Sequence, residues 1–302
     1  MVLGSVVPVF GLIALSFAFS RRFRPDLSIT LRLTAQLFIP CLIFSSVLQA
    51  EVEPDKVRDA VLATLTQIGC GFAVGGLGVW LLSKRFSSWR NKRELLLPIA
   101  FVNSANLPFP IVLANFGTEG LSYAVVCFLV TNFTVFTVGT TILHGGRKWR
   151  DAFKEPVLPV TFLAFALRLA GIHLPPEILG IPKLAGQAAV PLMLLLFGDA
   201  LARTRMRAPG VTVGAVILRY ASGALALWLT LTILQPEGTL RSVLTLYALL
   251  PSAVVNVVLA QRAGRDAPAV ASVILGATLV ALFLIPWLLG SGAKNVLGPV
   301  GP

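Results

Sequence analysis

Long apolar stretches separated by short polar segments run along the whole chain. Most of them approach or exceed the roughly 20 mostly apolar residues that an α-helix needs to cross a bilayer. The pattern predicts an all-α membrane protein. The ten predicted transmembrane helices cover residues 2–19, 29–49, 60–83, 95–116, 119–143, 157–173, 183–202, 211–234, 240–261 and 267–290.

The composition excludes a soluble protein of this size. Hydrophobic residues make up 56% of the 302 residues and charged residues only 13%, and the mean hydropathy is +0.84. A soluble chain has about 25% charged residues with which to cover its surface. Lipid is therefore expected to solvate much of the outside.

The positive charges lie mainly in alternate loops. Of the 25 Lys and Arg residues, 17 fall on one side of the predicted topology and five on the other. The positive-inside rule places the richer side in the cytoplasm and both termini outside. We therefore interpret the net charge of +12 as a topology signal, and expect no nucleic-acid partner.

The residue types that hold metals or perform catalysis are scarce in the predicted spans. Cys41, Cys70 and Cys127 lie in apolar runs without a CxxC pair, which argues against structural zinc, haem attachment or a disulfide framework. His144 and His173 lie at span ends, and the spans contain no acidic pair. We expect no cofactor and no metal, and the sequence disfavours a membrane-embedded enzyme.

Two short patterns recur at a constant distance along the chain. Residues 7–9 (Val-Pro-Val) match residues 158–160 (Leu-Pro-Val), and Gln36-x-x-x-Pro40 matches Gln187-x-x-x-Pro191, both at an offset of 151. One match could arise by chance, but two at one offset indicate a duplication. A ten-helix bundle with accidental symmetry is the alternative.

The duplication predicts two five-helix repeats, at residues 1–143 and 157–302, joined by a cytoplasmic linker at 144–156. Because five is an odd number, the second repeat enters the membrane from the opposite side. Inverted repeats of this kind are common in secondary transporters, whose substrate site lies near the midplane where the repeats meet.

The fourth predicted span is interrupted by polar residues and prolines. Asn103 and Asn106 are three residues apart, so their amides would share one face of a helical turn, next to Ser104. Pro108 and Pro110 each remove a backbone donor and predict a helix break. Free backbone groups at this depth are tolerated only where they meet protein, water or ligand.

The ninth span carries the matching interruption, with Pro251, Ser252 and Asn256. If both helices break and cross, two helix N-termini meet, each with roughly half a positive charge and free N–H groups. Asn103, Ser104, Asn106, Ser252 and Asn256 would then bind a carboxylate. The competing interpretation is that the asparagines join helices and the prolines only kink them.

Four further polar residues lie within or near the spans. Gln36 and Gln187, one turn before the repeated prolines, either line the same cavity or serve packing. Arg219 lies deep in the eighth span, where it could line the cavity, attract an anion, pair with Asp199 or snorkel to the surface. Asp199, near the end of the seventh span, is either a proton-coupling group or a solvated acid.

These motifs resemble the auxin efflux carrier family, in order and spacing, along essentially the whole chain. The matching segments are Asn103-Ser-Ala-Asn106-Leu-Pro108, Asn115-Phe-Gly117, Pro191-Leu-Met-Leu-Leu-Leu-Phe-Gly198 and Pro251-Ser-Ala-Val-Val-Asn256. The resemblance implies ten transmembrane helices in two inverted five-helix repeats with crossed, broken helices 4 and 9, similar to the bile acid:sodium symporters. It also implies that Asn103 and Asn106 bind a substrate carboxylate.

Two departures from the family pattern concern the substrate. Members often have glycine where this chain has Val102 and Ala105, and the long cytoplasmic loop of plant auxin exporters is absent. Both argue against auxin itself as substrate, and the compact form suits a carrier of the prokaryotic inner (plasma) membrane.

The sequence thus predicts a secondary transporter that exports a small organic anion, such as an auxin-like molecule or a dicarboxylate, by alternating access. A sodium- or proton-coupled symporter of organic anions is the alternative, although the crossover offers amides and hydroxyls but no acid. The expected partners are the anion and the lipid bilayer, with a homodimer as the expected assembly.

Overall fold

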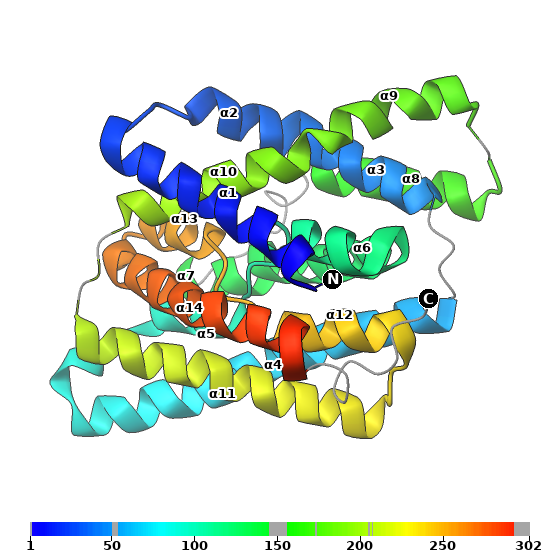
Figure 1. The fold of residues 1–302 in the computed structure, drawn as a ribbon. Coiled ribbons are helices and arrows are strands. Elements are labelled where there is room, and N and C mark those ends of the chain that lie inside the picture. Colours follow the sequence, from blue (N-terminus) through cyan, green and yellow to red (C-terminus); the bar gives the residue numbers. More distant parts are fainter. Residues whose placement is uncertain are drawn as a thin grey trace. The chain divides into compact units, whose positions relative to one another are not determined.

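The computed structural model describes residues 2–49, 54–144, 156–172, 174–204, 206 and 208–292. Most of the predicted linker 144–156 lies outside these ranges. Within them the chain is almost entirely helical (Figure 1), which confirms the predicted all-α class. The α-helices are α1 (Val2–Phe23), α2 (Ser28–Leu33), α3 (Ile39–Gln49), α4 (Pro54–Arg85), α5 (Leu96–Ala100), α6 (Pro108–Thr134), α7 (Thr140–His144), α8 (Val157–Leu169), α9 (Pro176–Gln187), α10 (Ala189–Arg203), α11 (Pro209–Ile233), α12 (Gly238–Ala248), α13 (Val255–Arg262) and α14 (Ala267–Trp287).

Six stretches of the described chain are long and apolar enough to cross a membrane: Ser28–Gln49, Asp55–Arg85, Pro108–Leu143, Pro176–Arg203, Pro209–Ile233 and Ala267–Gly290. Five of them coincide with single predicted spans. Pro108–Leu143 instead combines the predicted fifth span with the end of the fourth. The boundary predicted between those two spans is a kink inside α6, at Gly117, whose φ of 63° and ψ of −159° are not helical. Glycine adopts such a positive φ without the steric cost that a side chain would add.

The chain divides into two compact units that do not coincide with the predicted repeats. Unit 1 comprises Met1–Glu53, Ala105–Val125 and Trp149–Arg203. Unit 2 comprises Pro54–Ser104, Val126–Lys148 and Thr204–Pro302. Each unit therefore takes helices from both halves of the sequence.

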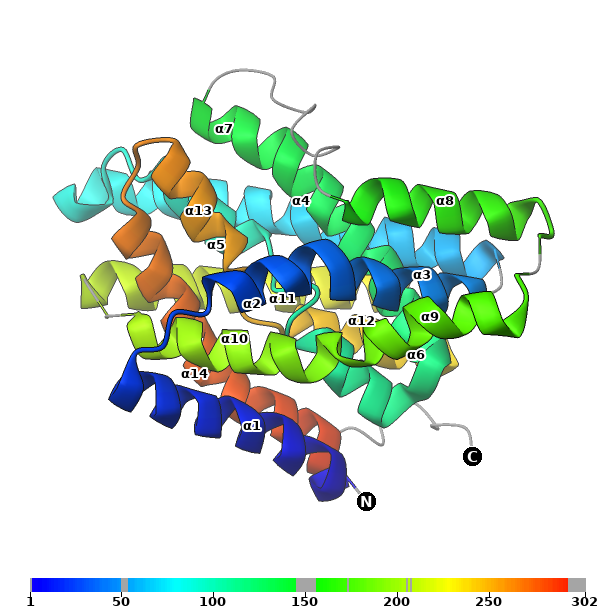
Figure 2. The same cartoon turned by 90° about the horizontal axis from the view of Figure 1, so that it is seen from above.

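In unit 1, helices from the first half of the chain pack on helices from the second half. Helix α1 lies along α10, and α3 packs on α8 and α9 (Figures 1 and 2). In the pairs α1–α10 and α3–α8, an arginine of one helix caps the other. Arg21 of α1 donates to the Ala202 carbonyl of α10 at 3.3 Å, and Arg168 of α8 donates to the Val47 carbonyl of α3 at 2.8 Å. A cation at a helix C-terminus is favourable because the unsatisfied carbonyls carry partial negative charge.

The Gln-x-x-x-Pro pattern occurs once in each half of the sequence, and both copies lie in unit 1 at an irregular helical turn. Pro40 and Pro191 have no N–H to donate to the carbonyl four residues earlier, which belongs to Gln36 or Gln187. The structure has a π-helical turn at Thr34–Phe38 before Pro40, and a helix break at Ala188 before Pro191. The pattern thus predicts local helix distortion on physical grounds.

Glycines permit the close packing of the unit 1 helices. A Cβ atom on Gly198 of α10 would lie 2.5 Å from the Ile13 carbonyl oxygen of α1, and one on Gly186 of α9 would lie 2.7 Å from the Leu42 Cα of α3. Small residues at helix interfaces let backbones approach in membrane proteins, where lipid provides little hydrophobic driving force for association.

We expect Gly198→Leu to lower the free energy of unfolding by about 1–3 kcal/mol, because the new side chain meets backbone that cannot move aside. The effect is measured by thermal unfolding in detergent. The matched control is Gly180→Leu, since a Cβ at Gly180 of α9 has nothing within 4 Å. Equal destabilisation by both changes would show that the contact with α1 is not the cause.

Unit 2 is built on the long helices α4 and α11, which lie side by side (Figure 1), with the short helices α5 and α12 packed on them. A core of apolar side chains joins α5, α11 and α14 and includes Leu95, Ile99, Ala215 and Val273. This core holds α5 in place, while α12 packs on α4 and α11. Both short helices are interrupted after their last residue.

Candidate functional site: the paired helix interruptions

The two interruptions of unit 2 follow α5 and α12. After Ala100 the chain leaves the helix until α6 begins at Pro108, and after Ala248 it leaves the helix until α13 begins at Val255. Pro251 lies inside the second interruption, and Pro108 and Pro110 form the first turn of α6. Proline is unfavourable inside a helix but well suited to its first turn, which explains where the helices stop and restart.

The two interrupted segments pair with each other as short extended strands. Val102 and Ser252 form an isolated antiparallel bridge. The N–H of Asn103 donates to the Pro251 carbonyl at 2.7 Å, and the N–H of Ala253 donates to the Phe101 carbonyl at 3.0 Å. Backbone groups released by the helix breaks are thereby satisfied inside the protein, as they must be at membrane depth.

Side chains strengthen the same pairing. Asn256 is 0% exposed, and its Nδ2 donates to the Phe101 carbonyl at 3.2 Å. The hydroxyl of Ser252 donates to the Pro98 carbonyl, and the hydroxyl of Tyr247 donates to the Ser104 carbonyl at 2.8 Å. The hydroxyl of Ser252 and the amide nitrogen of Asn256, both predicted to bind substrate, thus bond to the backbone of the crossover in this structure.

The side-chain oxygen of Asn256 keeps an open bonding position. The Oδ1 of Asn256 is buried and has no hydrogen-bond partner within the described part of the chain. Buried polar atoms are nearly always bonded, because an unsatisfied one costs about 1–3 kcal/mol. The Asn256 oxygen is therefore available to a donor that the protein itself does not supply. The predicted residues Asn103 and Ser104 are also buried.

Arg219 lies beside the crossover. It is 1% exposed in the middle of α11, and its Nη2 donates to the Leu250 carbonyl at 2.8 Å and to the Ala248 carbonyl at 3.3 Å. Its guanidinium therefore caps the C-terminus of α12, one residue before Pro251. The predicted alternative of snorkelling to the surface is wrong, because the group is buried and bound to these carbonyls. Asp199, the other predicted partner, pairs with Arg203 within unit 1.

The charge of Arg219 is only partly balanced. A helix C-terminus carries roughly half a negative charge. Arg219 has no carboxylate within salt-bridge distance in the described ranges, and its Nε has no hydrogen-bond partner there. About half a positive charge thus remains at the crossover. Buried charges in membrane proteins are rare and usually mark substrate or ion pathways.

Gly223, one turn after Arg219 on α11, leaves the space that this arrangement needs. A Cβ on Gly223 would lie 2.3 Å from the Ala248 carbonyl oxygen and 2.8 Å from the Arg219 Nη1. The Ala248 oxygen is a backbone atom, and the Arg219 guanidinium is held in place by the hydrogen bonds of its Nη2. An alanine at this position therefore cannot be accommodated without moving α12 or the guanidinium.

We expect Gly223→Ala to lower the free energy of unfolding by about 1–3 kcal/mol and to reduce transport activity along with it. Thermal unfolding and substrate flux in proteoliposomes measure the two effects. In the control Gly76→Ala, where a Cβ on α4 has nothing within 4 Å, stability should hold or rise slightly. Wild-type flux in Gly223→Ala would contradict a role for this close approach.

The first turns of α6 and α13 contain fewer free backbone N–H groups than the sequence predicts. The N–H of Phe109 in α6 donates to the Ala105 carbonyl at 3.1 Å, and Pro108 and Pro110 have none. In α13, the N–H groups of Asn256 and Val257 donate to carbonyls in the preceding turn, at 3.2 and 3.0 Å. Ligand binding at the crossover would therefore rest more on amide side chains and on Arg219 than on backbone donors.

The remaining predicted site residues, which are Gln36, Asn106, Pro108, Pro110 and Gln187, all belong to unit 1. Asn106 is half-buried, and Pro108 and Pro110 are buried in the first turn of α6. Gln36 and Gln187 are exposed on the surface of unit 1. A role for these five residues in substrate binding stays a prediction.

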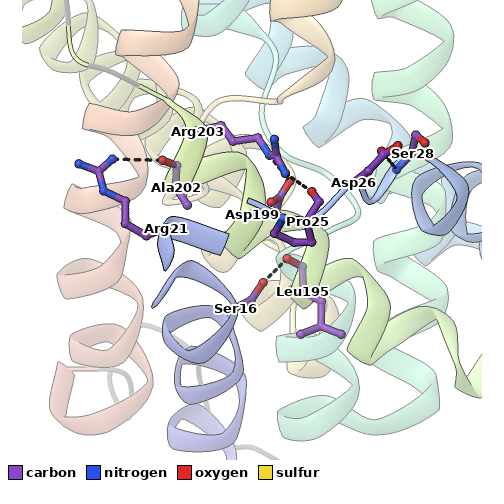
Figure 3. A network of polar contacts seen from close by, with 9 residues as sticks. All are labelled: Ser16, Arg21, Pro25, Asp26, Ser28, Leu195, Asp199, Ala202 and Arg203. Atoms are coloured by element: carbon purple, nitrogen blue, oxygen red, sulfur yellow. Dashed lines mark hydrogen bonds and ion pairs between the residues drawn. The ribbon is translucent and has the colours of Figure 1, made fainter. Parts of the chain in front are cut away.

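Asp199 belongs to a polar network at the ends of α1 and α10 (Figure 3). The Nε of Arg203 contacts the Asp199 carboxylate at 2.7 Å, and the same guanidinium donates to the Pro25 carbonyl. The hydroxyl of Ser16 donates to the Leu195 carbonyl at 2.6 Å. Asp199 is therefore a buried, paired acid that holds the end of α10, which differs from the solvated acid considered above.

The sequence interpretation missed three polar residues of unit 2. Gln67 of α4 donates to the Tyr247 carbonyl at 2.8 Å, and Tyr247 in turn holds Ser104. Glu94 is 2% exposed and lies 3.9 Å from Lys92, which also pairs with Asp266. Gln67 was visible as a polar residue in an apolar span. Glu94 lies one residue before the predicted fourth span, where a charged residue gives no signal of burial.

Among the described residues, no group of three His, Cys, Asp or Glu side chains could hold a metal ion. The site is instead a buried pair of helix interruptions with amide groups and a partly balanced guanidinium. The long apolar helices together with this buried polar cluster indicate an integral membrane protein.

Comparisons with known proteins identify the class. The family model described as membrane transport protein matches the chain twice, at residues 1–148 and 145–289. The chain is 27% identical over 295 residues to a protein of Methanothermobacter thermautotrophicus named uncharacterized transporter. The match covers 95% of this chain and 93% of the relative. A Methanocaldococcus jannaschii protein, also named uncharacterized transporter, is 26% identical over 267 residues, or 83% and 86% of the two chains.

The protein is thus a membrane transporter. More particularly, it belongs to the membrane transport protein family, that of the auxin efflux carriers, which the sequence motifs resemble. The two successive matches to one family model also agree with the internal duplication of the sequence.

Proposed function

We propose that the protein is a secondary transporter that exports a small organic anion, a carboxylate, by alternating access. The observation that carries the proposal is the buried Arg219 beside the paired interruptions of unit 2. Its charge exceeds the half charge of the α12 terminus. An anionic substrate would supply the balancing charge, whereas a neutral or cationic one would leave the site positive.

The amide groups at the crossover suit a carboxylate ligand. A hydroxyl group on the substrate would donate to the Asn256 Oδ1, which lacks a donor. The Asn103 and Asn106 amides, carried over from the family resemblance, would donate to the carboxylate oxygens. Ser104 and Ser252 lie on the same interrupted segments and would shape the site around them.

We further propose that the chain has ten transmembrane helices in two inverted five-helix repeats, with helices 4 and 9 broken and crossed. Several observations support this plan. The family model matches both halves, α1 and α8 each use an arginine to cap a helix of the other half, and residues 102 and 252 pair with each other. In a twofold-related pair of repeats, equivalent segments meet at the axis in this way.

Export of an anion needs no coupling ion. A cell interior that is negative favours outward movement of each unit charge by about 2.3 kcal/mol per 100 mV. The alternative, coupling to sodium or protons, is weaker because sodium sites need several converging oxygen ligands, often with a carboxylate. We propose the prokaryotic inner membrane as the location, with both termini outside, and a homodimer as the assembly.

Ligand-induced stabilisation tests the substrate class. The purified protein is heated in detergent with a panel of mono- and dicarboxylates, each beside its neutral amide. A ligand at 100 times its Kd should add about 2.7 kcal/mol of stability. We expect at least one carboxylate to raise the melting temperature while its amide does not. Stabilisation by amides and carboxylates alike would contradict an anion site.

A further inference from the structure

An apolar groove lies on unit 1 between the end of α1, the start of α2 and α10. Its volume is about 690 Å³, within the roughly 300–1,000 Å³ of typical ligand pockets. The lining residues include Leu15, Phe19, Phe23, Leu27, Leu192 and Leu195. Phe19 is 53% exposed and Phe23 63%, so the groove opens at the surface of the unit. Its walls suit a hydrocarbon chain.

The wall of the groove contains one polar group without a partner. Ser20 is 2% exposed and lines the groove, and its hydroxyl has no hydrogen-bond partner within the described residues. The neighbouring hydroxyl of Ser16 is already bonded to the Leu195 carbonyl. Because a buried hydroxyl is costly when unsatisfied, Ser20 points to a ligand that carries an acceptor, such as an ester carbonyl, next to its apolar part.

Basic residues alternate in sequence with the groove-lining residues Phe23 and Pro25. Arg21 and Arg22 form the last turn of α1, and Arg24 follows at once. The Arg22 guanidinium lies 5.4 Å from the centre of the Phe23 ring, which lines the groove. The one acidic residue in this segment is Asp26, whose carboxylate accepts the Ser28 N–H at 2.9 Å. That hydrogen bond holds the pKa of Asp26 below its usual range, and three arginines outnumber it.

We propose that this groove binds an anionic phospholipid, with one acyl chain in the groove, a glycerol ester at Ser20 and the headgroup at Arg22 and Arg24. Clusters of basic residues next to a membrane helix attract anionic lipids of the cytoplasmic leaflet. The arginines lie on the side that the positive-inside rule assigns to the cytoplasm. The choice of leaflet thus rests on the proposed orientation, while the site itself does not depend on the transported substrate.

Fluorescence quenching by brominated lipids tests the proposal. Phe19→Trp places a reporter in the groove, and the signal of the five native tryptophans is removed by subtracting the wild-type signal. The full-length protein is reconstituted in phosphatidylcholine with increasing amounts of phosphatidylglycerol or phosphatidylcholine brominated on its acyl chains. We expect brominated phosphatidylglycerol to quench the reporter at a roughly tenfold lower mole fraction than brominated phosphatidylcholine.

Two matched controls separate the groove from the lipid surface in general. Leu184→Trp reports on α9, where Leu184 is 73% exposed and does not line the groove, and both lipids should quench it equally. With Phe19→Trp, the double change Arg22→Gln and Arg24→Gln should remove the lipid preference, while Lys183→Gln should keep it. All three charged side chains are exposed, so their replacement should leave the fold intact.

Equal quenching of Phe19→Trp by both lipids would overturn the proposal, as would a preference that survives the double arginine change. Absence of quenching by either lipid would also overturn it, because a protein surface would then cover the groove. If Phe19→Trp does not fold, Leu15→Trp, which is 69% exposed in the same groove, replaces it as reporter. None of these readouts depends on transport, so failure of the anion proposal would leave the result unaffected.

Discussion

Arg219→Gln is expected to abolish anion transport while leaving a folded protein. Glutamine can still donate to the Leu250 or Ala248 carbonyl, but it removes the charge that balances an anion at the crossover. At low dielectric a nearby unit charge has a large effect on ligand affinity. We expect flux to fall at least a hundredfold, or about 2.8 kcal/mol at 1.4 kcal/mol per factor of ten, in a proteoliposome assay with the wild-type substrate.

Arg168→Gln is the matched control, because Arg168 also donates to a carbonyl at the end of a helix, that of Val47 in α3. Both changes remove a helix-capping cation, so their effects on thermal stability should be similar. Only Arg219→Gln removes charge from the crossover. If both variants lose stability to the same degree and Arg219→Gln retains flux, Arg219 is a structural cap and the anion proposal loses its main support.

Asn256→Asp should have the second largest effect, on both stability and transport. The change replaces the Nδ2 group that donates to the Phe101 carbonyl with an oxygen that repels it, in a site that is 0% exposed. Loss of the bond and burial of an unsatisfied oxygen should cost about 1–3 kcal/mol of folding free energy. If the carboxyl ionises, it would also neutralise the positive charge of Arg219 and so lower the affinity for an anion.

Asn132→Asp provides the comparison, since Asn132 is a half-buried residue of α6 outside the interruptions. Thermal unfolding and substrate binding are measured on both variants. We expect Asn132→Asp to bind substrate like the wild type and Asn256→Asp to bind it at least tenfold more weakly. Wild-type binding by Asn256→Asp would remove this residue from the site and would favour its interpretation as a packing group.

Much of the local structure could be predicted from proline positions. Pro108 and Pro251 mark the two interruptions, and Pro40 and Pro191 mark the distorted turns that follow Gln36 and Gln187. The breaks near Pro108 and Pro251 were predictable because a missing N–H and a ring clash act on the chain regardless of its neighbours. The place of Arg219 in the middle of a long helix was likewise predictable, from its distance along an apolar span.

The partners of these residues could not be predicted. The spans are apolar on most sides, and lipid is as apolar as a neighbouring helix, so periodicity does not show which face meets protein. The sequence therefore did not reveal that α1 packs on α10, or that Arg219 bonds to the end of α12. For the same reason Ser252 and Asn256 were predicted as substrate ligands, although their hydroxyl and amide nitrogen hold the backbone.

The division into two units also lay beyond the sequence pattern. Sequence order suggests halves that meet at the linker, whereas each compact unit combines segments from both halves. Such mixing follows when equivalent helices of two repeats pack on each other rather than on their own neighbours. Only long-range contacts, such as that of Gln67 with the Tyr247 carbonyl, reveal it.

Charge movement across proteoliposomes tests the central claim most directly. The protein is challenged with mono- and dicarboxylates under an imposed membrane potential, with and without sodium, beside the Arg219→Gln variant. Electrogenic anion export predicts a current with at least one carboxylate that is independent of sodium and absent in the variant. A current that requires sodium, or one that persists in Arg219→Gln, would contradict the account.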